Sequence, residues 1–451
     1  MINRGLFVNM KKNFILSCSY KYYRNSIGGT DQYIRAQQLQ FNEAGISYYY
    51  IFPFNVINSF FQRHRIFWGV VIDGKLSYVK STDSIISMLN NMQNDGMVCG
   101  AVIINHIKNI DLNQLSEIIK ALKTQTFFCI HDYYIACISS NFYITECNKV
   151  CAHKKIDILL CKDCIYFEKS YIVHEKVLEF FDQCNHNINI ICPSELCKSI
   201  LLKSFKCLSG YINVIPHYSF SRTKISNKEC NFPLRVAFIG TQSRIKGWDI
   251  FLTLVNSYPN DYKFYYFGRN VSRNKLITNV EVDNSLDKNR MIDRLKEYSI
   301  DIVILWSIVP ETYSFTYYEC LFSNCYIVTS RDSGNICCMV EENNNGLICD
   351  ENELYKIFSS PSNLEHMVID YLCKDLKYDY EYHLNNELRD SLNIDLNSNR
   401  QITAEIHQDR FKIIERILMI LLIIEIEVSS NIKKIYRKLF YLLEFFKMKS
   451  S

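Results

Sequence analysis

Short apolar runs alternate along the chain with stretches whose apolar residues recur at helical spacing. Four of these runs, at residues 13–18, 127–130, 234–239 and 302–306, have the length and composition of strands. Strands that are apolar throughout are typical of parallel sheets buried on both faces. Their alternation with helical stretches favours sheets that are covered by helices. The pattern therefore predicts an α/β protein.

The chain is long enough to predict two domains. It has 451 residues, and single hydrophobic cores rarely grow beyond about 250 to 300 residues. Residues 217–233 are polar and end in Pro233, so we expect a linker there. We assign 1–220 to an N-terminal domain, 234–400 to a C-terminal domain and 401–451 to a helical tail. Ligands of open α/β sheets bind beyond the carboxyl ends of the strands, so two such domains predict a cleft at the linker.

Two glutamates follow the last of the four strands. Glu311 and Glu319 have seven residues between them, where the strand meets a helix that Ser314 or Thr316 can cap. Eight helical steps of roughly 1.5 Å separate the carboxylates by up to about 12 Å. The free amides at the helix start, from Ser314, Phe315 and Thr316, suit a phosphate between them. Carboxylates accept hydrogen bonds from sugar hydroxyls, so the spacing suits a nucleotide diphospho-sugar. The alternative interpretation is that the two glutamates are unrelated and do not form one site.

A basic loop follows the strand at 234–239. It contains Arg244 and Lys246, then Gly247, and leads into a helical stretch. An ordinary basic turn, with glycine for flexibility, is one interpretation. The other is a phosphate-binding loop at the carboxyl end of a strand.

The order of strand, Lys-Gly loop and later Glu-x7-Glu resembles the donor half of retaining GT-B glycosyltransferases of family 4. The resemblance implies that Lys246 neutralises the donor diphosphate, that Glu311 orients the donor sugar and that Glu319 binds the ribose. Thr241 stands where the family has an arginine, which leaves that role open. Arg244, three residues later, is the candidate to replace it.

Two motifs in the N-terminal half fit the same resemblance. Gly28 and Gly29 precede an amphipathic helix, where glycine lets a backbone approach a ligand, although such a pair is more often a turn. His131 ends the strand at 127–130, a place where a histidine is commonly structural. The resemblance implies that Gly28 and Gly29 cover the donor phosphates and that His131 contacts the transferred sugar. Neither a Gly-x-Gly-x-x-Gly nor a Gly-x4-Gly-Lys-Ser/Thr motif is present, so Rossmann cofactor and P-loop sites lack their fingerprint.

The resemblance implies a GT-B fold, with two Rossmann-like parallel-sheet domains facing across a cleft and a C-terminal helical tail. The expected activity is retaining transfer of a hexose from a nucleotide-diphospho-sugar to a saccharide or lipid-linked acceptor, in the synthesis of a surface polysaccharide such as O-antigen, capsule or exopolysaccharide. Catalysis requires no cofactor and no metal in such folds. The alternative is a catalytically silent nucleotide-sugar-binding subunit of a polysaccharide assembly complex.

Composition narrows the class of protein. Hydrophobic residues make up 48% of the chain and charged residues 22%, as in globular proteins. The net charge of +4 gives no reason to expect a nucleic-acid partner. The apolar run at 13–18 is too short for a signal peptide. The sequence also has no run of about 18 apolar residues, the length that is needed to span a bilayer. We therefore expect a cytoplasmic protein.

Nineteen cysteines in a long chain without an export signal predict buried thiols rather than disulfides. One group stands apart, in an insertion at about 145–170: Cys147, Cys151, Cys161 and Cys164. Four thiolates at these spacings suit a tetrahedral structural zinc site. Chance clustering in a cysteine-rich chain is the alternative.

The tail from Ile413 onward has apolar residues at steps of three and four, which predicts a helical stripe. Residues 431–451 contain six Lys or Arg and one Glu, a net charge of +5. Such a helix suits the surface of an anionic membrane, on the inner face of which the protein would be peripheral. Packing back across the N-terminal domain explains the stripe equally well.

Overall fold

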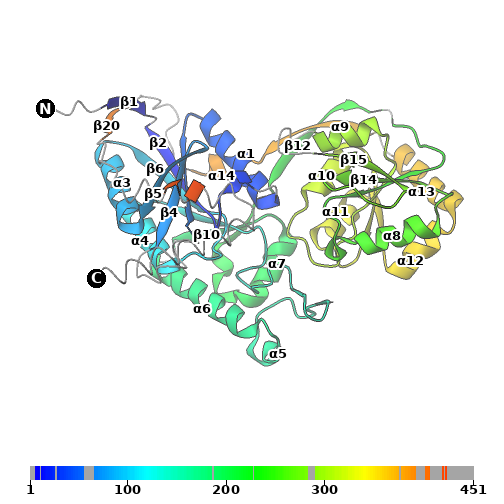
Figure 1. Ribbon diagram of the computed structural model, residues 1–451, viewed down its shortest axis with the longest axis horizontal. Helices are drawn as coiled ribbons and strands as arrows, with labels where there is room; N and C mark the ends of the chain where they lie inside the picture. The colour runs from blue at the N-terminus through cyan, green and yellow to red at the C-terminus, as the bar shows by residue number, and fades with distance from the viewer. Residues whose placement is uncertain are drawn as a thin grey trace, which may run out of the picture. The chain divides into compact units, whose positions relative to one another are not determined.

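The structure is a computed structural model that describes residues 6–10, 12–25, 28–54, 66–184, 187–226, 228–282, 290–374, 377–392, 402–406, 419–420 and 422–423. Contacts between residues divide the chain into two compact units (Figure 1). The first comprises Met1–Phe128, Glu179–Ile188 and Arg389–Ser451, and the second comprises Cys129–Leu178 and Asn189–Leu388. Much of the segment that we assigned to the N-terminal domain therefore belongs to the second unit.

The first unit contains a mixed sheet. Strands β7, β6, β2 and β3 lie side by side in that order and run parallel. Strands β4 and β5, joined by a short turn, continue the sheet antiparallel at one edge, a feature that the sequence analysis did not predict. The strands are β2 (Asn13–Cys18), β3 (Ser47–Pro53), β4 (Phe67–Ile72), β5 (Lys75–Ser81), β6 (Val98–Ile104) and β7 (Thr126–Cys129).

Three helices connect these strands: α1 (Gly29–Glu43), α3 (Thr82–Asn94) and α4 (Leu112–Leu122). Asp111 caps α4 by accepting hydrogen bonds from two amides of its first turn, which would otherwise lack a partner. The helix then buries one face, with Leu115, Ile118 and Leu122 in the core. A separate antiparallel pair joins β1 (Leu6–Met10) to β20 (Ile402–Ile406).

The second unit is built on a six-stranded sheet in the order β15-β14-β13-β16-β17-β18, and all of its neighbouring strands are parallel. This confirms the predicted parallel α/β architecture for this half of the chain. The strands are β13 (Arg235–Ile239), β14 (Lys263–Gly268), β15 (Ile277–Glu281), β16 (Ile302–Ile304), β17 (Tyr326–Ser330) and β18 (Gly346–Cys349).

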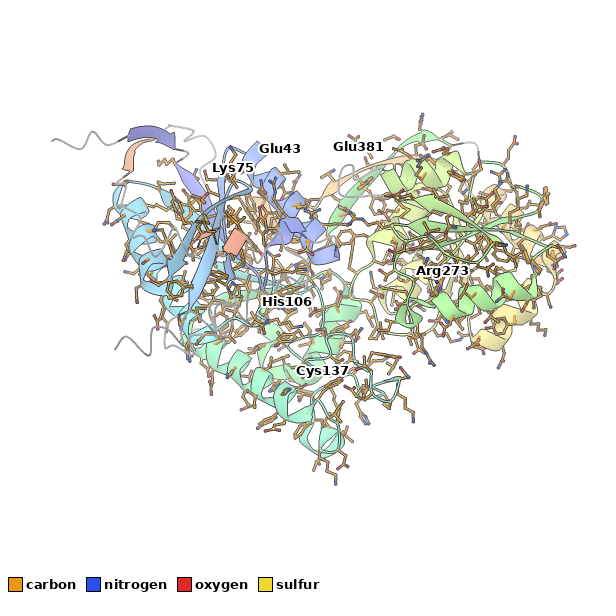
Figure 2. All side chains as sticks on the ribbon, in the orientation of Figure 1. Glu43, Lys75, His106, Cys137, Arg273 and Glu381 are labelled. Atoms are coloured by element: carbon orange, nitrogen blue, oxygen red, sulfur yellow. The ribbon has the colours of Figure 1, made fainter. Side chains whose placement is uncertain are left out.

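Both faces of this sheet are covered by helices, and Figure 2 shows side chains on both sides of it. Val236 and Phe238 of β13 pack into one core, with residues of α8, α12 and α13. Ala237 and Ile239 point to the opposite face and pack with residues of α9, α10 and α11. Successive strand residues alternate between faces, so a strand buried on both sides must be apolar throughout. The helices are α8 (Trp248–Ser257), α9 (Arg290–Glu297), α10 (Phe315–Phe322), α11 (Asn335–Asn343), α12 (Glu351–Phe358) and α13 (Pro361–Lys374).

The polar segment that we expected to be a linker forms a strand over much of its length. β12 (Tyr218–Ile225) pairs antiparallel with β19 (Tyr378–Leu384). Aromatic side chains on the two strands hold the pair together, since the ring of Phe220 lies 5.9 Å from that of Tyr380. These aromatic residues are spread among serines and lysines, which made the segment look polar in the sequence.

The remaining elements of this half are short or irregular, apart from one long helix. Strands β10 and β11 pair parallel on either side of α7, and β8 and β9 form a small antiparallel pair. The bounds are β8 (Tyr143–Ile144), β9 (Lys149–Val150), α5 (Ile158–Cys161), α6 (Phe167–Gln183), β10 (Ile188–Cys192), α7 (Glu195–Ser204), β11 (Ile212–Val214) and α14 (Glu387–Asp390).

The predicted apolar stripe of the tail lies almost entirely outside the described residues. Of the stripe positions, Ile420 is described and is exposed. Leu422, which is not part of the stripe, is buried, and a Cβ built on Gly69 would lie 3.0 Å from its side chain. Within the part of the chain that the structure describes, no helix is long and apolar enough to cross a membrane.

Candidate functional site

Lys246 and Glu311 form an ion pair in the second unit. Lys246 Nζ lies 2.6 Å from Glu311 Oε1. Strands β13 and β16 are parallel neighbours, so the loops that follow them meet at the same edge of the sheet. Lys246 belongs to the first loop and Glu311 to the second, which brings together two residues that the sequence predicted for one site. The lysine side chain is 46% exposed and the glutamate 16%, so the pair is open to solvent on one side.

The loop that contains Lys246 depends on a glycine. Gly247 has φ +78°, in the left-handed region, and a Cβ there would lie 2.4 Å from the backbone oxygen of Trp306. The loop therefore packs directly on the backbone that follows β16. Arg244, in the same loop, lies 3.8 Å from the carboxylate of Asp249 and is largely exposed. Its predicted part in phosphate binding remains a prediction.

The carboxylate of Glu311 is held from behind by a serine. Ser307 Oγ lies 2.8 Å from Glu311 Oε1 and can donate a hydrogen bond to it. Ser307 is buried, and its backbone oxygen accepts hydrogen bonds from the hydroxyls of Ser330 and Ser333. Because the side chain of Ser307 is buried and its backbone oxygen is hydrogen-bonded, its hydroxyl group has little freedom to move. Ser307 therefore orients Glu311.

The backbone of Glu311 is held as firmly as its side chain. Glu311 forms an isolated parallel bridge with Gly334, and its oxygen accepts a hydrogen bond of 3.0 Å from Asn335 N–H. Gly334 has φ +66°, and a Cβ there would lie 2.4 Å from the nitrogen of Glu311. Only glycine allows this approach. Sequence analysis missed both Ser307 and Gly334, although the position of Ser307 just after a predicted strand was a signal for it.

Helix α10 begins beside this pair, as the sequence predicted. Ser314 is its N-cap and accepts a hydrogen bond of 3.2 Å from Tyr317 N–H. Phe315 and Thr316 are its first residues, so their amides lie at the positive end of the helix dipole. Glu319 lies further along the same helix, and burial raises the pKa of its carboxyl group to about 7.

His131 is linked to the residue after Glu311. The hydroxyl of Thr312 donates a hydrogen bond of 2.7 Å to the backbone oxygen of His131. The His131 ring lies 5.2 Å from that of His217, which is buried and stacks on Phe315. His131, Glu311 and the start of α10 thus lie close together within the second unit. Nothing in the sequence indicated a role for His217 beyond its place after a short strand.

Burial lowers the pKa of His217 to about 3, against about 6.5 in an unfolded chain. Between about pH 3 and pH 6.5 the unfolded state therefore binds more protons than the folded state. The stability that neutral His217 provides is lost as the pH falls from 6.5 towards 3. Between pH 7.5 and pH 5 this loss amounts to about 2 kcal/mol. We expect His217→Gln, which cannot titrate, to show a smaller loss of stability over this range than the wild type.

Urea denaturation of both proteins at the two pH values measures this difference. Burial raises the pKa of the Glu319 carboxyl group, so this group changes the stability in the opposite direction. Its contribution to the free energy of unfolding is present below its unfolded pKa and is lost as the pH rises through about 7. It does so in both proteins, so it cancels in the comparison. Equal changes in the wild type and the variant would show that His217 does not titrate as expected.

Gly28 and Gly29 belong to the first unit. Gly28 is the N-cap residue of α1, and Gly29 is the first residue of the helix. Both are exposed, as a ligand-contacting turn requires. Close by, Asp31 is buried and forms an ion pair of 3.0 Å with Lys21. The predicted role of the two glycines at the donor phosphates remains a prediction.

The four cysteines predicted as zinc ligands are not gathered as a set. Cys147 is exposed, Cys151 and Cys164 are half-buried, and Cys161 is buried. Among the residues that the structure describes, no three His, Cys, Asp or Glu side chains are placed to hold a metal ion. All nineteen cysteines are free thiols in the structure.

No protein-family model matches the sequence, and no curated protein matches it. Several solved structures resemble the chain over most of its length. HepE of Anabaena, in complex with UDP and glucose, is 10% identical, with 82% of this chain and 96% of that chain covered and a TM-score of 0.45. Sucrose-phosphate synthase of Thermosynechococcus elongatus is 11% identical, with 80% and 94% covered and a TM-score of 0.46. A glycosyltransferase of Rickettsia africae is 13% identical, with 82% and 94% covered and a TM-score of 0.43.

Proposed function

We propose that this protein is a retaining GT-B glycosyltransferase that moves a sugar from a nucleotide-diphospho-sugar to a saccharide or lipid-linked acceptor. The observation that carries the proposal is the ion pair between Lys246 and Glu311 beside the start of α10. A cation, a carboxylate and free helix amides in one place suit a substrate that has both a diphosphate and a sugar.

Each residue of the site has a part in the reaction. When the bond from the anomeric carbon to the diphosphate oxygen breaks, negative charge builds on the phosphate and positive charge on the sugar. Lys246 and the first amides of α10 stabilise the phosphate charge, and Glu311 lends negative potential to the sugar. The acceptor hydroxyl then forms the new bond on the face that the diphosphate leaves, and its proton passes to a phosphate oxygen. The ring of His131 orients the sugar, and Glu319 binds the ribose.

The ion pair also fixes the positions of the two side chains. A lysine alone in a phosphate site is mobile, because its side chain has four rotatable carbons. Glu311 holds Lys246 at 2.6 Å while Ser307 holds Glu311. On binding, the donor diphosphate takes over the lysine, and the glutamate is released to accept hydrogen bonds from the sugar.

The proposal is tested by a thermal-shift screen of nucleotide sugars, followed by turnover assays with those that bind. A true donor stabilises the folded protein by mass action, and slow release of free sugar and nucleoside diphosphate would demonstrate turnover without a known acceptor. Binding with no turnover, even with acceptor mixtures, would instead favour a catalytically silent subunit. Absence of any shift with all nucleotide sugars would contradict both functions.

Lys246→Ala is expected to weaken nucleoside diphosphate binding by about 10- to 100-fold, since a charge-assisted hydrogen bond contributes roughly 1.5 to 3 kcal/mol. Isothermal titration calorimetry with UDP, GDP, CDP and ADP measures the affinity without requiring catalysis. Lys263→Ala is the matched control, because Lys263 is an exposed lysine at the opposite, amino end of strand β14. Equal affinities of the two variants would show that the phosphate loop is placed wrongly.

A further inference from the structure

The proposed site combines residues from two loops that are far apart in the sequence. Glu311 lies after β16, and His131 lies after β7. In the proposed function both side chains contact the same sugar. Groups that act together on one substrate must be held to within about 0.5 Å of their productive positions. Thr312, the residue after Glu311, contacts both the loop of His131 and a third segment of the chain.

The hydroxyl and the backbone oxygen of Thr312 both have protein partners. Thr312 is buried, and its hydroxyl donates a hydrogen bond of 2.7 Å to the backbone oxygen of His131. Its backbone oxygen accepts a hydrogen bond of 2.8 Å from the hydroxyl of Ser194. Ser194 is the N-cap residue of α7, and its side chain also accepts a hydrogen bond of 3.1 Å from Cys197 N–H. Thr312 therefore joins three segments: the loops after β7 and β16, and the start of α7.

The chain on either side of Thr312 is fixed by other contacts. Before it, Glu311 forms the parallel bridge with Gly334. After it, the ring of Tyr313 packs 4.6 Å from the ring of His217, and both residues are buried. Thr312 therefore presents its hydroxyl from a fixed position.

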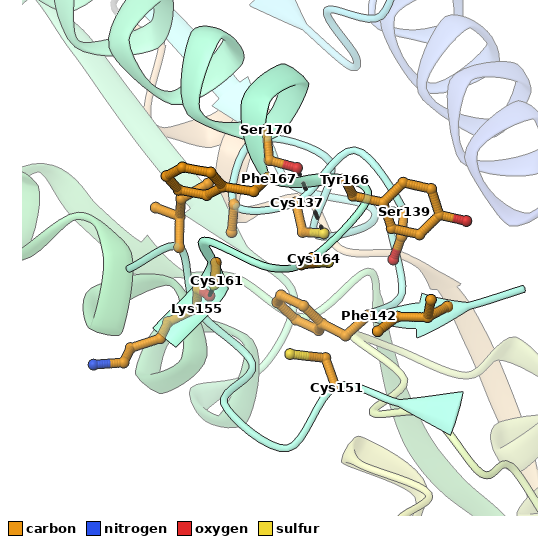
Figure 3. Close-up of a pocket in the computed structure, with 13 residues that line it drawn as sticks. Cys137, Ser139, Phe142, Cys151, Lys155, Cys161, Cys164, Tyr166, Phe167 and Ser170 are labelled. Atoms are coloured by element: carbon orange, nitrogen blue, oxygen red, sulfur yellow. Dashed lines mark hydrogen bonds between the residues drawn. The ribbon is translucent and has the colours of Figure 1, made fainter. Parts of the chain in front are cut away.

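The loop of His131 is held together by contacts of its own. Tyr133 N–H donates a hydrogen bond of 2.8 Å to the backbone oxygen of Ser140, and the Tyr133 ring lies 4.9 Å from that of Phe142. Phe142 in turn lines a small cavity in this segment, as Figure 3 shows. These contacts lie within the segment itself, so they do not set its distance from the loop after β16. The hydrogen bond from Thr312 does.

We propose that Thr312 is a positioning residue, whose hydroxyl holds the loop of His131 beside Glu311 so that both side chains reach one sugar. The inference rests on the proposed function. Loss of the hydroxyl frees the loop of His131, and the ring is then in place less often when positive charge builds on the sugar. The effect is expected in kcat. Binding of the nucleoside diphosphate, which the proposed function assigns to Lys246, should not change.

The test compares three variants of Thr312. Valine has nearly the shape of threonine without the hydroxyl, whereas serine keeps the hydroxyl without the methyl group. We expect Thr312→Val to lower kcat by about 10- to 100-fold, since a misplacement of about 1 Å can cost about 100-fold in rate. Thr312→Ser should keep most of the wild-type kcat. Thr312→Ala, which differs from serine only in the hydroxyl, replaces Thr312→Val if that variant fails to fold.

Initial rates are measured with the nucleotide sugar that gives the largest thermal shift in the screen. Titration calorimetry with UDP, GDP, CDP and ADP measures the diphosphate affinity of each variant. Unchanged kcat in Thr312→Val would overturn the inference. An equal loss of kcat in Thr312→Ser and Thr312→Val would also overturn it, because packing of the methyl group and not the hydroxyl would then matter.

A double-mutant cycle distinguishes positioning from a role in stability alone. If Thr312 acts through His131, Thr312→Val lowers kcat in the wild-type background and has no further effect in a His131→Ala background. A hydrogen bond that served only stability would lower the melting temperature of both backgrounds and leave kcat of the folded protein unchanged. Equal reductions of kcat in the two backgrounds would contradict action through His131.

Thr124→Val is the matched control. The Thr124 hydroxyl also donates a hydrogen bond to a backbone oxygen, that of Gly100, at 3.1 Å, but it lies at the amino end of β7 in the first unit. This variant should leave kcat unchanged. Wild-type turnover separates the two proposals: if Thr312→Val turns over as fast as the wild type, only the inference fails. If the wild type has no turnover, the proposed function fails and the inference fails with it.

Discussion

Glu311→Gln is expected to lower kcat for sugar transfer by about 10²- to 10³-fold, or roughly 2.7 to 4 kcal/mol of transition-state stabilisation. Glutamine has the shape of glutamate and can still accept the hydrogen bond from Ser307, which lies 2.8 Å from the carboxylate. It lacks the negative charge that the proposed mechanism places beside the positively charged sugar. The variant therefore separates the effect of the negative charge on kcat from the effect of side-chain position. Initial rates with a donor found in the screen measure the effect.

The same variant should keep its affinity for nucleoside diphosphate. Glu311 is ion-paired with Lys246, so removing its charge leaves the lysine at least as available to a phosphate. A fall in kcat without weaker UDP binding would place Glu311 at the sugar and Lys246 at the phosphate. Glu341→Gln, an exposed glutamate on α11, is the control. Unchanged turnover in Glu311→Gln would remove this residue from the proposed mechanism.

Gly247→Ala is expected to destabilise the second unit by about 3 kcal/mol or more. The left-handed φ of +78° costs an alanine roughly 1 to 2 kcal/mol. Its Cβ would also lie 2.4 Å from Trp306 O and 2.5 Å from Trp306 Cβ, and neither atom can move without shifting the backbone after β16. At about 2 to 4 °C per kcal/mol for a unit of this size, the melting temperature should fall by roughly 6 to 12 °C. Differential scanning fluorimetry measures it.

Gly210→Ala is the control for this substitution. A Cβ on Gly210 has no heavy atom within 4 Å, and its φ is not in the left-handed region. Its effect should stay within about 0.5 kcal/mol. Because Gly247 follows Lys246 in the chain, Gly247→Ala should also weaken nucleoside diphosphate binding, while Gly210→Ala should not. Similar melting temperatures for both alanine variants would show that the loop does not pack on Trp306 as described.

The main elements of the second unit's sheet could be predicted because their signal is local. The apolar run at 234–239 became β13 (Arg235–Ile239), and that at 302–306 became β16 (Ile302–Ile304). In a parallel sheet the loops after neighbouring strands emerge at one edge, so a lysine after one and a glutamate after the other were expected to meet. Their separation of 2.6 Å agrees with this expectation.

Other features depend on contacts between residues that are far apart in the sequence. The pairing of β12 with β19 joins residues more than 150 positions apart, and no local pattern in the polar segment at 217–233 indicates it. The buried position of His217 follows from the same packing, since its ring stacks on Phe315 from α10. The antiparallel edge of β4 and β5 was likewise missed, because an apolar strand does not reveal the direction of its neighbour.

By itself, the sequence determined that this protein has parallel sheets covered by helices and that Lys246, Glu311 and the start of a helix share one edge of a sheet. Apolar periodicity and the residues that end strands and begin helices specify that much. Only the tertiary structure decided which residues support the site, namely Ser307 and Gly334 behind Glu311, and Thr312 between Glu311 and His131. The physical reason is that such contacts arise when separate loops pack in direct contact with one another, and spacing along the chain carries no information about which loops will do so.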